Sequence, residues 1–337
     1  MKRFLIFVCV FALLMSALVS CQKDTTDPTP DEKPADSETA KTPEEKEEST
    51  PSTPASKPAE KDKTYRIILS PDIHYTRKLQ WSGLTSEERA QMWVDAIIAE
   101  HEEEPIDLVV LMGDISLDHW MHGGNWLEDE ESDAEIFIWE QAIAKLPKEI
   151  EVFALPGNHE QFGYDEWEIM MGNERQDYRV MGDHLILLLD NFADGLNPEE
   201  DHDGVYTGVD MEYVNEIVAQ YPDKYIWIVT HFTHLPFESE AFKEFLRTNT
   251  NVKAIFHGHN HTLDVEDLGE EYNNVKLIMC GQFSYTGSQA PLDQYYSFRD
   301  LHLDRYGGVC NYIIPEVDLI VNGEPVEYQK VEDVDFY

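Results

Sequence analysis

Residues 107–114 read DLVVLMGD, five consecutive apolar residues followed at once by a glycine and an aspartate. An uninterrupted apolar run of this length predicts a strand over Asp107–Met112 that is buried on both faces, as strands are when helices cover both sides of a sheet. Four further runs have the same strand-like character: Arg66–Ser70, Ile150–Leu155, Lys224–Thr230 and Val252–Phe256. The sequence therefore predicts an α/β fold with these strands at its core.

Helical patterns lie between these strands. Thr85 and Glu88 form a capping-box pattern, which predicts a helix from there to about Glu102. Two more helices are predicted over Asp133–Leu146 and Met211–Tyr221. The remaining predicted strands are His184–Leu189, Val275–Cys280 and Gly308–Ile314. No helix is expected between the last two strands, so the fold should end in strands.

Polar side chains follow each of the five apolar strands at the point where it ends. The clusters are Asp72-Ile73-His74, Gly113-Asp114, Gly157-Asn158-His159-Glu160, His231 and Gly258-His259-Asn260-His261. In open α/β sheets, ligands bind beyond the carboxyl ends of the strands. We therefore expect the five clusters to converge on one site.

The residue types in these clusters are those that bind divalent metal ions. Carboxylate and carboxamide oxygens together with imidazole suit zinc, manganese or iron. Asp-x-His and His-x-His place alternate side chains of an extended segment on one side. A glycine before Asp114, Asn158 and His259 lets the backbone turn sharply beside an ion. Each motif alone could be structural, but all five in this order, each at a strand end, indicate a metal site.

The constellation resembles that of the calcineurin-like metallophosphoesterases, and the resemblance covers about Tyr65 to His261. It implies a four-layer α/β/β/α sandwich of two mixed sheets flanked by helices, with a dinuclear metal site at the C-terminal ends of the strands. It also implies two divalent ions, which would be manganese, iron or zinc. One ion would be bound by Asp72, His74 and His261, the other by Asn158, His231 and His259, and Asp114 would bridge the two.

The same resemblance implies a reaction. Small phosphate mono- or diesters would be hydrolysed by a hydroxide that the two ions activate. His159 would not bind metal; it would face the leaving group and donate a proton to it as general acid. Glu160 would either orient His159 or make a plain hydrogen bond within its loop.

Departures from known subfamilies narrow the expected substrate. No Asp-Arg-Gly follows Gly113-Asp114, unlike in the serine/threonine phosphatases of the family. Leu117 stands where purple acid phosphatases have a tyrosine ligand. The 76 residues after His261 are too few for the large substrate domain of exported 5′-nucleotidases. A compact phosphodiesterase or phosphomonoesterase is therefore expected.

A second function is compatible with the same residues, namely a catalytically silent surface lipoprotein that uses the fold to bind a partner or ligand. The complete set of seven candidate ligands with His159 favours the enzyme. Several loop residues could contact a substrate, although ordinary loop positions explain them more simply. These are Arg77, Lys78, His119, Trp120, Trp126, Phe162, Tyr164 and His234.

The chain is strongly acidic, with 67 acidic and 25 basic residues and a formal net charge of −42. Of this charge, −39 belongs to residues 64–337, because the residues before them contribute only −3. A surface of this charge repels nucleic acid, so no nucleic acid is expected as a partner, and solubility is the simplest use of the acidity. The expected partner is a small phosphate ester, and no obligate protein partner is indicated.

The N-terminus has the pattern of an export signal with a lipid-attachment site. Lys2-Arg3 precede an apolar run from Phe4 to Val19. This run is shorter than the roughly 20 residues that a membrane-spanning helix needs. The following Leu18-Val19-Ser20-Cys21 resembles the lipobox of bacterial lipoproteins, in which the cysteine is acylated. We therefore expect the protein to be exported and anchored by lipid on Cys21 at the bacterial cell envelope, with the outer membrane or cell surface as possible sites.

The organisation of the chain follows from this start. Residues 1–21 are the expected lipoprotein signal peptide. Residues 22–63 are rich in Pro, Thr, Ser, Glu and Lys and hold no aromatic residue, which predicts a disordered tether. Residues 64–337 are the expected catalytic domain. In an exported protein its two cysteines, Cys280 and Cys310, could form a disulfide or remain as buried thiols, and the sequence leaves both open.

We predict that Cys21→Ala releases the protein from membranes or leaves it unprocessed, because the variant lacks the sulfur that would carry the lipid. Membrane fractionation and incorporation of labelled fatty acid measure the effect. Cys9→Ala, which changes a cysteine of the same apolar run, is the matched control and should behave as wild type. Wild-type protein that fractionates as soluble and incorporates no fatty acid would rule out the anchor.

Overall fold

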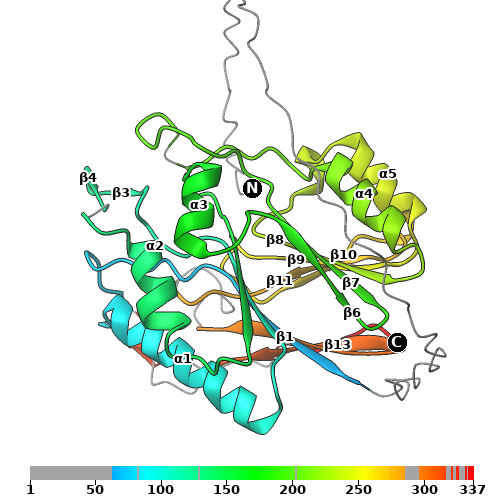
Figure 1. Ribbon diagram of the computed structural model, residues 1–337, viewed down its shortest axis with the longest axis horizontal. Coiled ribbons are helices and arrows are strands. Elements are labelled where there is room, and N and C mark those ends of the chain that lie inside the picture. Colours follow the sequence, from blue (N-terminus) through cyan, green and yellow to red (C-terminus); the bar gives the residue numbers. More distant parts are fainter. Residues whose placement is uncertain are drawn as a thin grey trace, which may run out of the picture. The chain divides into compact units, whose positions relative to one another are not determined.

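The structure is a computed structural model that describes residues 63–81, 83–127, 130–201, 203–284, 296–315, 320–321, 324–325, 331 and 333–337. The predicted signal peptide and all but the last residue of the predicted tether lie outside these residues. The described residues form two six-stranded sheets packed face to face, with helices over both outer faces (Figure 1). The predicted four-layer α/β/β/α sandwich of two mixed sheets is confirmed.

The first sheet has the strand order β16-β13-β12-β1-β2-β5. Its strands are β1 (Tyr65–Ser70), β2 (Leu108–Met112), β5 (Glu151–Leu155), β12 (Phe298–Asp304), β13 (Gly307–Ile313) and β16 (Val334–Asp335). The neighbours β1, β2 and β5 are parallel, whereas β12, β13 and β16 extend the sheet with antiparallel pairs. The parallel half therefore directs three of the polar clusters to one edge.

The second sheet has the strand order β10-β11-β9-β8-β7-β6. Its strands are β6 (Asp177–Met181), β7 (His184–Leu189), β8 (Tyr225–Thr230), β9 (Val252–His257), β10 (Val265–Asp267) and β11 (Lys276–Met279). The four central strands are parallel, and an antiparallel strand closes each edge. The remaining two polar clusters follow β8 and β9.

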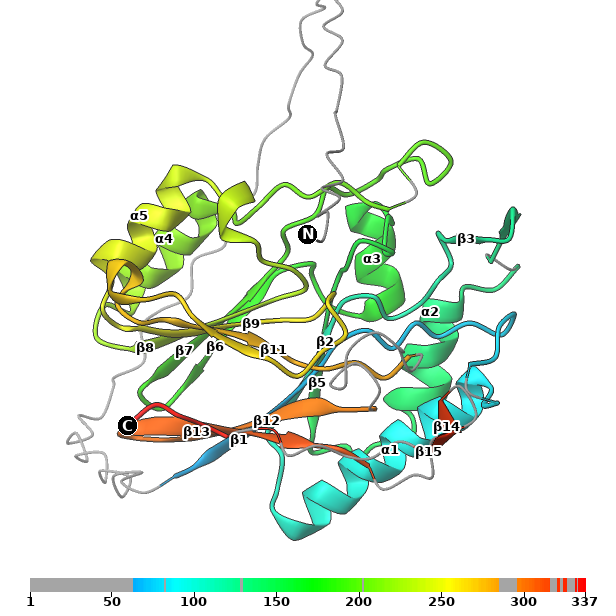
Figure 2. The ribbon, with the colours of Figure 1, turned by 180° about the vertical axis from the view of Figure 1, so that it is seen from behind.

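The helices lie on the two outer faces, as Figures 1 and 2 show. The first sheet is covered by α1 (Ser86–Glu103), α2 (Asp133–Ile136) and α3 (Tyr164–Met171), and the second by α4 (Met211–Gln220) and α5 (Glu240–Thr248). Short elements complete the fold: the 3₁₀ turns η2 (Leu235–Phe237) and η3 (Glu270–Tyr272), and the pairs β3 (Met121–His122) with β4 (Asn125–Trp126) and β14 (Ile320–Val321) with β15 (Glu324–Pro325). No helix in the described part of the chain is both long and apolar enough to cross a membrane.

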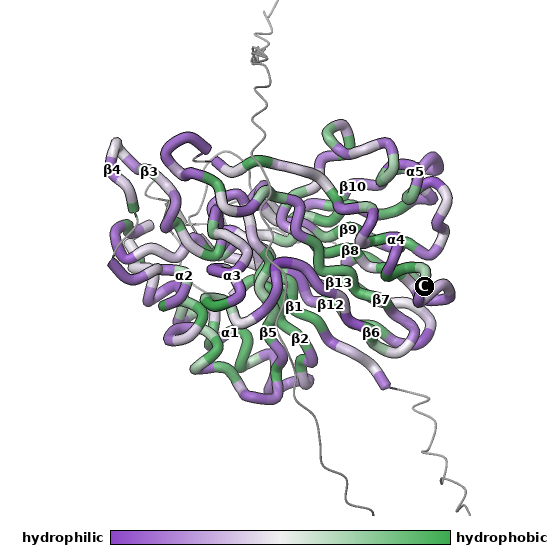
Figure 3. The backbone as a smooth tube through the Cα atoms, turned by 45° about the horizontal axis from the view of Figure 1, so that its top comes forward, coloured by the Kyte–Doolittle hydropathy of each residue, from purple (hydrophilic) through white to green (hydrophobic). Residues whose placement is uncertain are grey.

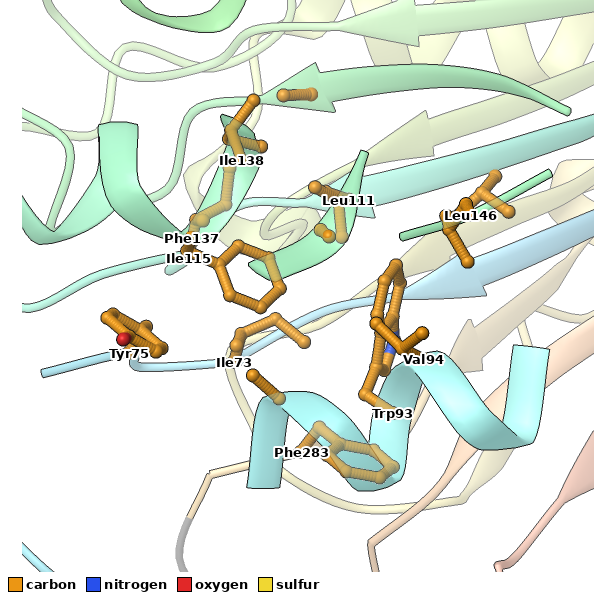
Figure 4. Packing of buried hydrophobic residues seen from close by; sticks show 14 of the residues in the cluster. Ile73, Tyr75, Trp93, Val94, Leu111, Ile115, Phe137, Ile138, Leu146 and Phe283 are labelled. Atoms are coloured by element: carbon orange, nitrogen blue, oxygen red, sulfur yellow. The ribbon is translucent and has the colours of Figure 1, made fainter. Parts of the chain in front are cut away.

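Consecutive residues of the core strands face different apolar layers. In β1, Ile67 and Leu69 lie between the two sheets, whereas Ile68 belongs to the cluster beneath the helices of the first sheet. Figure 4 shows that cluster, where Trp93 of α1 packs near Phe137. Figure 3 shows apolar strands in the interior and polar loops around them. Because both faces of each strand are covered, no alternation of polar and apolar residues is needed.

The predicted helices begin where their sequence signals place them. Thr85 Oγ1 accepts a hydrogen bond from Glu88 N at 3.2 Å, and the Glu88 carboxylate accepts one from Thr85 N at 2.8 Å, so the capping box is confirmed. The helix predicted over Asp133–Leu146 starts as expected but changes character, because a π-helical segment, η1 (Phe137–Ala142), follows α2. This segment buries Phe137, whose ring packs near those of Trp93 in α1 and Tyr75.

Several elements carried no clear sequence signal. The sequence patterns did not predict α3, α5, β6, β10 or β12. In β12, charged residues occupy consecutive interior positions: Arg299 is buried and donates to Met279 O at 3.2 Å, and Asp300 is buried beside Arg66. Partners contributed by other strands make this burial possible, and a single segment does not reveal them.

Cys280 and Cys310 both lie between the two sheets and are free. Burial raises the pKa of the Cys310 thiol to about 12 and that of Cys280 well above its ordinary value, so both remain protonated. Of the two possibilities that the sequence left open, the structure has the buried thiols.

Candidate metal centre

The five polar clusters meet at one edge of the sandwich, where β1, β2, β5, β8 and β9 end. Backbone hydrogen bonds join the loops that carry them. Within the first sheet, His74 N donates to Asp114 O at 2.8 Å. Across the sheets, His259 N donates to Asp72 Oδ2 at 2.8 Å. The structure thus brings all seven predicted ligands and His159 together, although their sequence positions span almost 190 residues.

One group of side chains consists of Asp72, His74 and His261, whose potential ligand atoms all lie within 4.8 Å of one another. Asp72 Oδ1 lies 3.1 Å from His261 Nε2 and 3.9 Å from His74 Nε2. Asp72 is fully buried, and its Oδ1 makes no well-formed hydrogen bond within the described part of the chain. A buried carboxylate oxygen of this kind, facing two imidazole nitrogens, is what a bound cation would satisfy.

A second group surrounds the carboxamide of Asn158. Its Oδ1 lies 3.0 Å from His231 Nε2 and 2.8 Å from His259 Nδ1. The other ring nitrogen of His231, Nδ1, lies 2.7 Å from the carbonyl oxygen of Met112. Because that contact requires a proton on Nδ1, the lone pair of a neutral His231 is on Nε2, which faces the group.

Asp114 stands between the two groups. Its Oδ2 lies 3.2 Å from His74 Nε2, which belongs to the first group, and 3.3 Å from His231 Nε2, which belongs to the second. Burial alone would raise the pKa of this carboxyl, but the surrounding histidines hold it well below its usual value. In turn, burial alone would lower the pKa of His231, and Asp114 raises it to about 9. One carboxylate oxygen therefore serves both groups.

The backbone of the site is strained. Seven non-glycine residues in the described part of the chain have positive φ, and five of them are candidate ligands: Asp72, His74, Asp114, His259 and His261. Each such residue costs on the order of 1–3 kcal/mol and persists only where the surrounding structure enforces it. The concentration of strained residues is therefore a second, independent sign of a functional site.

Two glycines allow the loops to approach closely. A Cβ atom on Gly157 would lie 2.3 Å from Asp114 Oδ1, and one on Gly258 would lie 2.6 Å from Asp72 Oδ2. Neither glycine has a positive φ. The sequence predicted that glycine lets the backbone turn sharply here, but at these two positions glycine is needed because a side chain would collide with a candidate ligand.

Glu160 organises the loop of Asp114. Its carboxylate accepts backbone hydrogen bonds of 2.8–3.0 Å from Asp114, Ile115, Ser116 and Gly157. Burial and the nearby Asp114 raise its pKa to about 8, whereas the four N–H groups favour the ionised form. Of the two roles considered for Glu160, the loop hydrogen bond is the one the structure contains, and Glu160 makes no hydrogen bond with the described side chain of His159.

His159 lies beside both groups. Its Nε2 is 3.6 Å from Asp114 Oδ2, and its ring packs edge-on against those of His74 and Trp120. Burial lowers its pKa to about 4. His159 also forms a potential ligand group with His74 and Asp114, so its position alone does not separate a proton donor from a ligand.

A pocket of about 490 Å³ opens onto the two groups. Six of its lining residues are candidate ligands or His159, and the others are Leu79, Trp81, Leu117, Trp120, His122 and Asp203. The sequence patterns did not indicate Leu79, Trp81, His122 or Asp203 as site residues. Asp203 Oδ1 accepts a hydrogen bond from Asn158 Nδ2 at 3.1 Å, which turns the carboxamide oxygen toward the histidines. No sequence signal marks Asp203, which lies in a loop 45 residues away.

The other loop residues singled out from the sequence have different positions. Arg77 pairs with Asp133, and Lys78 Nζ lies 3.5 Å from Trp126 O. Among the described residues, no lysine or arginine lines the pocket. Phe162 is buried and packs on His119. Of the four loop aromatics considered, only Trp120 faces the pocket.

A model of the calcineurin-like phosphoesterase family matches residues 65–263, more than half of the chain. The chain belongs to this family. Family members use divalent metal ions, and the two groups around Asp114 are suited to hold them. As a calcineurin-like phosphoesterase, the chain has the fold and the donor set of a metal-dependent hydrolase.

Solved structures of other proteins are similar to this calcineurin-like phosphoesterase. A dimetal phosphatase from Danio rerio superposes with a TM-score of 0.56 at 13% identity, covering 79% of this chain and 99% of that chain. GAP50, the anchor in the inner membrane complex of Plasmodium, superposes with a TM-score of 0.47 at 12% identity, covering 81% and 90%. At 13% identity, the likeness to the first of these structures shows the fold alone. No curated protein matches the sequence.

We predict that Asp114→Ala weakens both metal sites, because Oδ2 faces histidines of both groups. The wild-type chain should bind about two divalent ions, and the variant should bind each at least about tenfold more weakly. Titration with Mn²⁺ and elemental analysis measure this. Asp165→Ala, which changes an exposed aspartate of α3, is the control. A variant that retains two ions with wild-type affinity would contradict the assignment.

Proposed function

We propose that this calcineurin-like phosphoesterase hydrolyses small phosphate mono- or diesters with two divalent metal ions. The observation that carries the proposal is the position of Asp114 Oδ2, within 3.3 Å of ring nitrogens from both groups. A single carboxylate oxygen shared in this way suits a pair of adjacent ions. A lone structural ion would need only one of the groups.

The proposed ligand assignment follows the two groups. Asp72, His74 and His261 would hold one ion, Asn158, His231 and His259 the other, and Asp114 both. The mixture of carboxylate, carboxamide and imidazole suits manganese, iron or zinc. When bound, two such ions lower the pKa of a water molecule and neutralise charge on the phosphate oxygens.

The chain itself would supply the proton for the leaving group. His159 lines the pocket and is the one lining histidine outside the proposed ligand set that is buried. We assign it as the general acid that protonates the leaving oxygen. A bound phosphate would bring negative charge next to the ring, which favours its protonated form and opposes the effect of burial.

We further propose that the enzyme acts at the bacterial cell envelope. Cys21 would carry the lipid, and residues 22–63 would act as an extended spacer between the membrane and the catalytic domain. The support for this proposal is the lipobox-like sequence and the composition of the segment that follows it.

We predict that the protein hydrolyses p-nitrophenyl phosphate or its bis-ester when Mn²⁺ is present. A chelator should abolish turnover, and added manganese should restore it. Comparison of the two esters decides between a monoesterase and a diesterase. Protein that binds two ions and hydrolyses neither ester would instead favour the catalytically silent surface lipoprotein.

We predict that His159→Ala retains its metals while turnover falls by roughly 10²–10⁴-fold, the usual contribution of a positioned acid. The loss should depend on the leaving group. Alkyl esters should suffer most because an alkoxide needs the proton, and esters of acidic phenols should suffer least. Measuring kcat/KM across substituted phenyl and alkyl esters provides the test.

The control for this series is His234→Ala, which changes an exposed loop histidine that does not line the pocket. This control should follow wild type for every ester. Equal losses across the series in His159→Ala would reassign His159 to phosphate binding or to ordering of the site.

A further inference from the structure

Part of the pocket lining is apolar. Its surface is formed by Leu79, Trp81, Leu117 and Trp120, which we call the apolar wall. The first two residues lie in the loop after β1 and the other two in the loop after β2. Leu117 is buried, and the other three are half-buried. These loops also carry His74 and Asp114, so the wall and the candidate ligands belong to the same two segments.

The two tryptophans of the apolar wall lie beside histidines of the site, and one of these is the proposed proton donor. The ring centres of Trp120 and His159 lie 4.6 Å apart in an edge-on arrangement. The ring centres of Trp81 and His74 lie 6.4 Å apart. A phosphate held between the two groups with its leaving oxygen toward His159 would therefore direct the leaving group along this wall.

The tryptophan nearest His74 is supported by a buried arginine. Arg89 Cζ lies 4.9 Å from the centre of the Trp81 ring. The guanidinium donates to the carbonyl oxygens of Ile73 and Phe283 at 2.8 and 2.7 Å, so it is fixed within the protein. The indole thus rests on a rigid base, which lowers the entropy cost of binding a ligand against it.

The described part of the pocket lining holds no permanently positive side chain for a second anionic group. Among the described residues that line it, none is lysine or arginine, and its exposed polar residues outside the candidate ligands are His122 and Asp203. Arg77 and Lys78, in the loop that carries Trp81, contact Asp133 and Trp126 O instead. A further phosphate or carboxylate on the leaving group would face Asp203 in a protein of strongly negative net charge.

We propose that the apolar wall binds the leaving group, and that the preferred substrates are phosphate esters of flat aromatic alcohols that carry no additional negative charge. Phenols and naphthols belong to this class. Flat apolar groups gain by burial and by stacking on indole rings. The inference rests on the proposed function, because it takes the phosphate to be held by the two metal groups.

The wall is tested with two substrates that share the phosphate but differ in flat apolar area, 2-naphthyl phosphate and acetyl phosphate. Trp120→Ala should lower kcat/KM for 2-naphthyl phosphate by roughly 5- to 100-fold, the range expected for loss of one stacking partner. The fall in kcat/KM for acetyl phosphate should be smaller, so that the ratio of the two kcat/KM values drops by at least about threefold. The inhibition constant of inorganic phosphate should stay near the wild-type value, because phosphate does not reach the wall.

Two further variants make the comparison specific. Trp120→Phe keeps an aromatic ring and should retain most of the preference for 2-naphthyl phosphate. Trp126→Ala removes a half-buried tryptophan that does not line the pocket, and it should follow wild type. Trp81→Ala repeats the test from the other loop if Trp120→Ala does not fold.

The charge requirement is tested with 4-sulfophenyl phosphate against phenyl phosphate. The sulfonate makes the phenol a better leaving group, so chemistry alone predicts faster turnover. We expect a lower kcat/KM instead, because the sulfonate would enter a pocket without a cationic side chain. Faster or equal turnover of the sulfonated ester would overturn the charge requirement.

The outcomes separate this inference from the function on which it rests. If the metal-loaded wild type hydrolyses none of these esters, both the function and the inference fail. If it hydrolyses them but the tryptophan variants lose activity equally on 2-naphthyl and acetyl phosphate, the function stands and the apolar wall is not the leaving-group site.

Discussion

The buried Asp114 is fixed at each of its polar atoms by a different part of the site. Its N–H donates to Glu160 Oε2, its carbonyl oxygen accepts from His74 N, and its Oδ1 accepts from His159 N. Only Oδ2 is left to face the ring nitrogens of His74 and His231. The rest of the site depends on this arrangement, because the loop after β2 carries Asp114 and the loops after β1, β5 and β8 all contact it.

Such a residue requires a rigid support. Asp114 has a φ of 51°, a conformation that costs free energy for any side chain other than glycine, and four other candidate ligands share it. The compensating free energy comes from the strands beneath them, which bury apolar residues on both faces; in β2 all five residues are buried. The long apolar runs of the sequence and the strained loops at their ends are therefore linked. Burial of the strands offsets the free-energy cost of the unfavourable backbone conformation of the candidate ligands.

The acidity of the chain bears on the chemistry as well. Residues 64–337 carry a net charge of −39, and neither lysine nor arginine lines the pocket among the described residues. A phosphate ester is itself an anion, so side chains alone offer it little attraction. In the proposed function the metal ions would supply nearly all of the positive charge. The apolar wall would then select the uncharged part of the substrate.

The sequence alone determined the core strands, the capped first helix and the order of the polar motifs at the strand ends. These features follow from short-range rules, because burial on both faces gives a continuous apolar run and a cap needs only Thr85 and Glu88. The convergence of the seven candidate ligands could also be predicted, since parallel strands place their carboxyl ends at a common edge.

Tertiary structure decided the features that depend on partners distant in the chain. The buried charges of β12 have their partners outside that strand: Asp300 accepts from Arg66, and Arg299 donates to the carbonyl oxygen of Met279. The role of Glu160 could not be read from its neighbour His159, since its four donors come from two loops brought together by folding. Asp203 and the apolar wall are likewise set by the paths of loops. A loop's path is decided by long-range packing, for which a local sequence pattern carries no signal.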